Sequence, residues 1–202
     1  VGFQTRGIVY YEDFNRITLI STDGSGYGET NYNNVGKNKW LMVTVVLESN
    51  TIASCPVYVQ TGPTFNNTAL TASSSTGGLT TWQNQGSTIN ATCVLGGIGY
   101  TGDTYPESGY SERDDETDVR IDELTVWNKI LDEDEIEELH NSHSPKAATA
   151  HSAYTASASN LYHWIRWGDA TGDTETTIKC SVHSGFVLDK NSAVTGTKIL
   201  NH

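Results

Sequence analysis

Basic residues are scarce in this sequence, where 12 Lys and Arg stand against 24 Asp and Glu and give a net charge of −12. Such a chain would repel a phosphate backbone, and no basic stripe offsets the acidic excess, so a nucleic-acid partner is excluded. Cation binding and plain solubility both account for the acidity, and solubility is the simpler reason.

Long apolar runs are also missing. No stretch approaches the ~20 residues that a membrane-spanning helix needs, so we expect no membrane insertion. The chain begins at Val1 without a Met, a charged leader or an apolar leader segment. This start predicts a processed product or part of a longer protein.

Cysteine is rare and odd in number. Cys55, Cys93 and Cys180 share no spacing typical of metal ligands. Pairing of Cys55 with Cys93 across two strands and free buried thiols are both compatible with the sequence, so cysteine usage does not settle the redox compartment.

The abundant residues favour β-structure. Charged residues make up only 18% of the 202 residues, and Gly, Ser, Thr, Asn and Tyr take their place, which is typical of an all-β chain rich in turns. The length fits one large domain or one and a half. Strand patterns occur at residues 7–11, 16–21, 40–47, 57–59 and 94–100.

Three regions of the N-terminal part carry finer expectations. The continuous apolar run at 40–47 predicts a strand covered on both faces, with Trp40 in the core. Residues 22–28 are rich in glycine and are not expected to hold regular structure. Residues 61–92 read as long loops with a strand or two.

A strand followed by a helix is the clearest local pattern. Residues 119–127 alternate apolar and polar, with a phase slip at Asp122-Glu123 that predicts a bulge. The one helix we expect runs from Asp132 to about Asn141, with Asp132 as N-cap and Glu135 three residues later. Residues 143–160 read as a linker. Residues 161–202 read as a C-terminal β segment, with Trp164 in a core.

The stretch from Asp118 to His140 resembles the closing strand and helix of laminin-G-like, concanavalin A-like lectin domains. Its Ile-Asp-Glu-Leu-Thr-Val-Trp-Asn strand runs into an Asp-Glu-Asp-Glu-Ile-Glu-Glu-Leu helix. The run at 40–47 and the Leu-Gly-Gly-Ile-Gly at 95–99 look like two further family strands in the same order. The resemblance covers residues 1–142 and implies a jelly-roll β-sandwich that lacks its first strands.

The C-terminal part carries a second resemblance. His151–Tyr154, Leu161–Asp169 and Thr177-Ile178 look like a segment that follows such lectin domains in virion proteins of marine bacteriophages, although Ile165 and Trp167 depart from that pattern. This resemblance implies a location on a virion or another extracellular surface. It also implies glycans or other surface proteins as partners and a homo-oligomeric assembly.

Catalysis by a glucanase of this fold would need a strand reading Glu-x-Asp-x-Glu, which places two carboxylates about 5 Å apart. The sequence has no such strand, and it has no Gly-x-Ser-x-Gly elbow for a serine hydrolase. We therefore expect a non-enzymatic virion structural or receptor-binding module. A secreted, calcium-dependent glycan-binding domain is the alternative, and a glycoside-active enzyme is a third class.

Sugar binding by such a module would use exposed aromatic rings. The candidates, each of which has core packing under a loop as its alternative, are Tyr27, Tyr32, Trp82, Tyr105 and Tyr110.

Calcium is the cofactor that the sequence makes plausible. Seven acidic residues crowd residues 103–118, and Ca²⁺ takes six to eight oxygen ligands. The candidate ligands are Asp114, Asp115 and Asp118, and a solvated acidic loop is the alternative.

Overall fold

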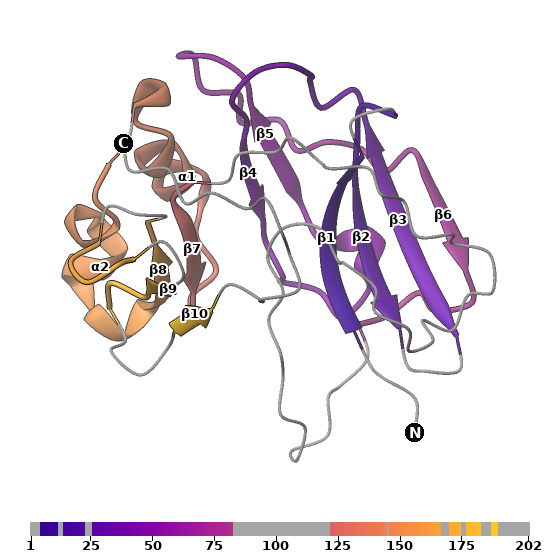
Figure 1. The fold of residues 1–202 in the computed structure, drawn as a ribbon. Coiled ribbons are helices and arrows are strands. Elements are labelled where there is room, and N and C mark those ends of the chain that lie inside the picture. The colour runs from indigo at the N-terminus through magenta and orange to yellow at the C-terminus, as the bar shows by residue number, and fades with distance from the viewer. Residues whose placement is uncertain are drawn as a thin grey trace. The chain divides into compact units, whose positions relative to one another are not determined.

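The computed structural model describes residues 5–11, 14–22, 26–82, 122–144, 146–166, 170–174, 177–182 and 187–189. The chain forms two compact units, one from residues 1–91 and 130–146 and the other from residues 92–129 and 147–202. Antiparallel strands dominate the described residues and helices are short, which confirms the predicted β-rich class (Figure 1).

The first unit contains a four-stranded antiparallel sheet in the order β1-β2-β3-β6 (Figure 1). Its strands are β1 (Thr5–Tyr11), β2 (Arg16–Thr22), β3 (Tyr27–Asn33) and β6 (Ser74–Gly77). The predicted strands at 7–11 and 16–21 are confirmed as β1 and β2.

A second antiparallel pair, β4 (Met42–Val45) with β5 (Val57–Gln60), belongs to the same unit. Side chains of both sheets, together with the short 3-10 helix η1 (Ile52–Ser54), share one buried core. Its members are Ile17, Leu19, Tyr32, Val35, Ile52, Cys55, Val57, Val59 and Trp82.

The apolar run at 40–47 is only partly buried. Leu41 and Val45 pack against the core, whereas Trp40 is 50% exposed and Leu47 is 60% exposed. The prediction of a strand covered on both faces, with Trp40 in the core, is therefore wrong. Continuous hydrophobicity does not distinguish a strand buried on both faces from one in which several apolar side chains stay at the surface.

Helix α1 (Glu133–His140) is confirmed close to its predicted bounds. The Asp132 side chain accepts a hydrogen bond from the Glu135 N–H at 2.9 Å, and the Glu135 carboxylate accepts from the Asp132 N–H at 3.0 Å. This reciprocal pair satisfies two backbone donors that a helix start leaves without partners.

Asp132→Ala is expected to lower the free energy of unfolding by about 1 kcal/mol, because the N-terminal donor of α1 loses its acceptor. Urea denaturation followed by circular dichroism measures the change. Asp134→Ala, in the first turn of α1 but outside the box, is the control and should cost less. Equal losses in the two variants would contradict a specific cap.

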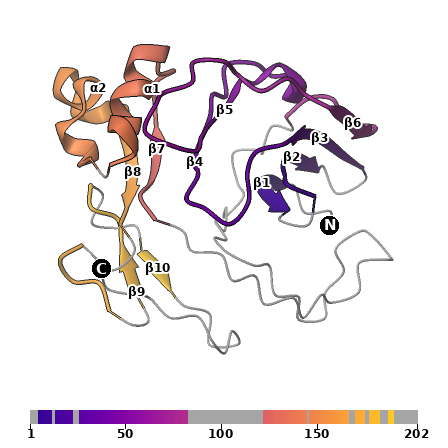
Figure 2. The same cartoon turned by 90° about the horizontal axis from the view of Figure 1, so that it is seen from above.

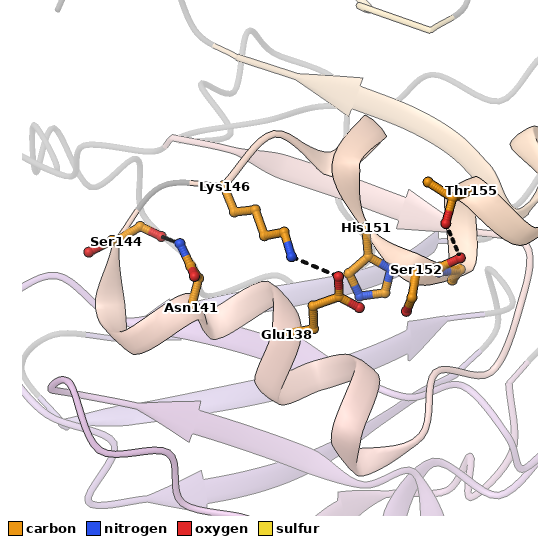
Figure 3. Close-up of polar contacts among 8 residues, drawn as sticks. Glu138, Asn141, Ser144, Lys146, His151, Ser152 and Thr155 are labelled. Atoms are coloured by element: carbon orange, nitrogen blue, oxygen red, sulfur yellow. Dashed lines mark hydrogen bonds and ion pairs between the residues drawn. The ribbon is translucent and has the colours of Figure 1, made fainter.

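The chain leaves α1 through three successive residues with positive φ, namely Asn141, Ser142 and His143, within the 3-10 turn η2 (Asn141–His143). The Asn141 amide donates to the Ser144 carbonyl at 3.3 Å, and the Lys146 ammonium pairs with Glu138 at 2.7 Å (Figure 3). These contacts hold the unusual left-handed turn at the end of the helix.

The second unit pairs β7 (Leu124–Trp127) with β8 (Leu161–Ile165), and β9 (Thr177–Lys179) with β10 (Val187–Asp189). The β9 and β10 arrows lie side by side in Figure 2. The expected closing strand of the N-terminal domain therefore hydrogen-bonds to the C-terminal segment. Long-range pairing of this kind is not visible in local sequence patterns.

The stretch 143–160 was expected to be a linker, but it holds a second helix, α2 (Ser152–Ala156), between the 3-10 turns η3 (Ala148–Ala150) and η4 (Ala158–Asn160). Ala148 and Ala153 are each 1% exposed. The Thr155 hydroxyl donates to the Ser152 carbonyl within α2 (Figure 3). Small side chains that resemble a flexible linker here allow close packing.

Glu123 lies just before β7, and its side chain contacts residues in and next to β8 within the second unit. Its φ of 52° is left-handed and lies at the predicted irregularity, just before β7 begins. Its carboxylate accepts from the Trp164 indole N–H at 2.6 Å and lies 3.9 Å from the Arg166 guanidinium. The predicted burial of Trp164 is confirmed, since the residue is 6% exposed.

Candidate functional site

Two of the five aromatic residues proposed for sugar contact lie in the core. Tyr32 is 1% exposed and Trp82 is 7% exposed. The Tyr32 hydroxyl donates to the Cys55 carbonyl at 3.2 Å, and the Trp82 indole N–H donates to the Cys55 sulfur at 3.2 Å. Burial, and secondly Cys55, raise the pKa of the Tyr32 hydroxyl above 10.0. For these two rings the structure supports the alternative of core packing, and neither is available for sugar contact.

Tyr27 is the candidate that the structure leaves accessible, because it is 37% exposed at the start of β3. Tyr105 and Tyr110 lie outside the described residues, as do the proposed calcium ligands Asp114, Asp115 and Asp118.

Strand β3 was not predicted, because its glycine and asparagines are disfavoured in strands. It is nevertheless a central strand, with β2 on one side and β6 on the other. Tyr32 and Thr30 point into the core, so the alternate residues of β3 point the other way. Backbone pairing on both sides outweighs the weak intrinsic propensity of the segment.

The side of β2, β3 and β6 that faces away from the core is here called the outer face. Directly opposed residues of antiparallel strands share a face, and the register places Thr18 opposite Asn31, Asn31 opposite Ser74, and Glu29 opposite Ile20 and Thr76. The outer face includes Arg16, Thr18, Ile20, Tyr27, Glu29, Asn31, Asn33, Ser74 and Thr76.

Hydrogen bonds link the polar residues of the outer face across three strands. The Thr18 hydroxyl donates to Asn31 Oδ1 at 2.8 Å, and the Asn31 amide donates to the Ser74 hydroxyl at 3.1 Å. The Thr76 hydroxyl donates to a Glu29 carboxylate oxygen at 3.4 Å. Thr18 and Asn31 are buried, so their side chains are held in place at one end of the outer face. The other end, at Tyr27, is more exposed.

Two glycines allow the chain to fold closely over this end. A Cβ at Gly28 would lie 1.7 Å from the Leu79 carbonyl oxygen, and one at Gly77 would lie 2.2 Å from the Tyr27 carbonyl oxygen. Gly77 also has a φ of +84°. The Leu79 N–H donates to the Tyr27 carbonyl at 3.1 Å, which fixes the backbone that carries the Tyr27 ring.

At its Tyr27 end the outer face therefore combines an accessible aromatic ring, one carboxylate and the exposed hydroxyls of Ser74 and Thr76 on a paired sheet, whereas the Thr18 hydroxyl and the Asn31 amide are buried. Sites built on strands hold side chains more precisely than sites on loops. Glu29 is the only carboxylate in β2, β3 and β6. These strands therefore do not supply the two carboxylates that glycoside hydrolysis requires.

No family model, curated protein or solved structure matches the chain. Its function must be argued from the outer face and the motifs above. Among the described helices, none has the length and apolarity to span a bilayer.

Sequence reasoning identified Tyr27 but missed its neighbours Glu29, Asn31 and Thr76. The signal that would have found them is the alternation Tyr-x-Glu-x-Asn within residues 27–31, which places three ligand-type side chains on one face of a strand. The glycines at 24, 26 and 28 instead led to the prediction of an irregular segment at residues 22–28.

Within the described ranges, no three His, Cys, Asp or Glu side chains gather as a metal site. Cys180 and His163 of the second unit form a pair, in which the sulfur and Nδ1 lie 3.7 Å apart. The backbone N–H of Trp164 donates to the same sulfur at 3.4 Å. Cys180, which directly follows β9, therefore packs against β8.

The calcium hypothesis predicts a metal-dependent melting temperature. If Asp114, Asp115 and Asp118 bind Ca²⁺, the ion relieves their mutual repulsion, and Ca²⁺ at 100 times its dissociation constant stabilises the fold by about 2.7 kcal/mol. A rise in melting temperature of roughly 5 °C should follow in millimolar Ca²⁺ relative to chelator. Magnesium is the control for charge screening. Equal melting temperatures in all three conditions would leave these residues as a solvated acidic loop.

Proposed function

We propose that this chain is a non-catalytic, lectin-like module that binds glycans from the surface of a virion or another extracellular assembly. The observation that carries the proposal is the outer face, where the accessible Tyr27 and the Glu29 carboxylate, two residues apart in β3, share one face of a hydrogen-bonded sheet. Apolar faces of pyranose rings stack on aromatic side chains, and sugar hydroxyls bond to carboxylates, amides and hydroxyls.

Preorganisation supports a binding role for this face. Side chains that are already ordered lose little conformational entropy when a ligand arrives. The Thr18–Asn31–Ser74 row is linked by hydrogen bonds before any ligand is present, and the Leu79 N–H fixes the backbone under Tyr27.

The fold we propose is a concanavalin A-like jelly roll. Two antiparallel sheets that share one core support it, as does the strand-to-helix motif at residues 118–140. The virion setting rests on the sequence resemblance of residues 151–178. A homo-oligomer suits this setting, because several weak sites on one assembly bind a glycan-covered surface far more tightly than one site does.

A glycan array with the intact chain tests the function. We expect wild type to bind at least one glycan class, and Tyr27→Ala to weaken that binding about tenfold through loss of the stacking surface. Tyr162→Ala, which removes a 53% exposed tyrosine from the second unit, is the matched control and should bind as wild type does.

Two outcomes would contradict the proposal. One is the absence of binding to every glycan class on the array. The other is equal binding by wild type and Tyr27→Ala, which would place any glycan site elsewhere. Release of reducing sugar from a bound glycan would overturn the non-catalytic part of the proposal.

A further inference from the structure

We infer that the glycan bound on the outer face is uncharged and offers a pair of free hydroxyls, and that Glu29 accepts these hydroxyls and excludes anionic sugars. The inference rests on the proposed function and deepens it by assigning a ligand class.

Glu29 has unused capacity to accept hydrogen bonds. An ionised carboxylate offers about four acceptor positions on its two oxygens. In the described part of the chain, the carboxylate accepts one side-chain hydrogen bond, from the Thr76 hydroxyl at 3.4 Å. The residue is partly buried, so its side chain is held against the sheet while part of it remains accessible to solvent.

The position of Glu29 relative to Tyr27 suits a single sugar ring. Residues two apart on one face of a strand lie about 7 Å from each other. A pyranose stacked on Tyr27 therefore places hydroxyls of its edge within reach of Glu29. A carboxylate with two oxygens accepts most effectively from two adjacent hydroxyls, which makes a free hydroxyl pair the feature that it recognises.

The charges on the outer face make an anionic sugar unfavourable. The residues opposite Glu29 are Ile20 and Thr76, neither of which carries a positive charge. The cation of the same three strands, Arg16, is paired with Asn33, about 13 Å along β3 from Glu29. A uronate or sulfate placed at Tyr27 would therefore meet the Glu29 carboxylate with no cation of β2, β3 or β6 between them, on a chain of net charge −12.

The test compares two oligosaccharides that differ at C6, a neutral galacto-oligosaccharide with a hydroxymethyl group there and the oligogalacturonide of the same linkage with a carboxylate. Any neutral glycan identified on the array is a further ligand. Affinities are measured by calorimetry at low and high salt. We expect wild type to prefer the neutral member about fivefold at low salt, the size of a like-charge contact in water. The preference should shrink as salt screens the repulsion.

Glu29→Gln keeps the shape of the side chain and removes its charge. It should gain affinity for the uronate and lose affinity for the neutral sugar, because an amide offers one acceptor oxygen instead of two. Glu137→Gln, on the exposed side of α1, makes the same change in net charge and is the control. The salt dependence of wild type tests the inference even if Glu29→Gln does not fold.

The outcomes separate the inference from the function on which it rests. A uronate that binds wild type as well as the neutral sugar does, or equal shifts in Glu29→Gln and Glu137→Gln, overturns the inference and leaves glycan binding intact. Absence of binding to any sugar overturns both.

Discussion

Gly28→Ala is expected to destabilise the first unit by about 3 kcal/mol, because the new methyl group has no space. Its Cβ would lie 1.7 Å from the Leu79 carbonyl oxygen and 2.7 Å from the Leu79 carbonyl carbon. Both are backbone atoms, so relief requires the chain at residues 77–79 to move away from β3. Chemical denaturation followed by fluorescence measures the loss.

Gly78→Ala is the control for this prediction, since a Cβ at Gly78 meets nothing within 4 Å. It should change the free energy of unfolding by less than about 1 kcal/mol. Gly28→Ala should also disturb the candidate site, because the Leu79 N–H donates to the Tyr27 carbonyl at 3.1 Å and this bond would be displaced. Wild-type stability in Gly28→Ala would mean that the close approach of Leu79 to β3 is wrong.

Trp164→Ala is expected to cost the second unit about 3 to 5 kcal/mol. Trp164 packs in a core with Ala148 and Leu161, and its indole N–H donates to Glu123 at 2.6 Å. The Arg166 guanidinium also lies 5.0 Å from the Trp164 ring. Removal of the indole therefore creates a cavity and takes a hydrogen-bond donor from a partly buried carboxylate.

Hydrogen exchange measured by mass spectrometry locates this loss. Amides of β7 and β8 should exchange faster in Trp164→Ala, because these two strands pair through Thr125 and Trp164. Tyr162→Ala, two residues away and 53% exposed at its side chain, is the control. Unchanged exchange in β7 would show that Trp164 does not hold the pair together.

The sequence predicted those elements whose signal is local. Helix α1 has its N-cap and its capping partner within four residues of chain, so Asp132 and Glu135 specified its start without help from tertiary structure. Strands β1, β2 and β5 carry β-branched and aromatic residues in short runs, which favours extended backbone wherever the strands are placed.

Elements that depend on distant partners were missed. β3 contains glycine and asparagine, and it is a strand because β2 and β6 pair with both of its edges. α2 lies in a stretch of small residues that resembles a linker, and burial of Ala148 and Ala153 distinguishes it from one. Such packing depends on contacts between residues far apart in the chain.

For the candidate site, the sequence by itself determined the residue types: several aromatic residues and an excess of acidic residues. Tertiary structure alone decided which rings are available, since Tyr32 and Trp82 are buried around Cys55 while Tyr27 is accessible. It also placed Glu29 and Thr76, which are 47 residues apart, on one face. The physical reason is that exposure and cross-strand pairing depend on the register between strands, which no local pattern encodes.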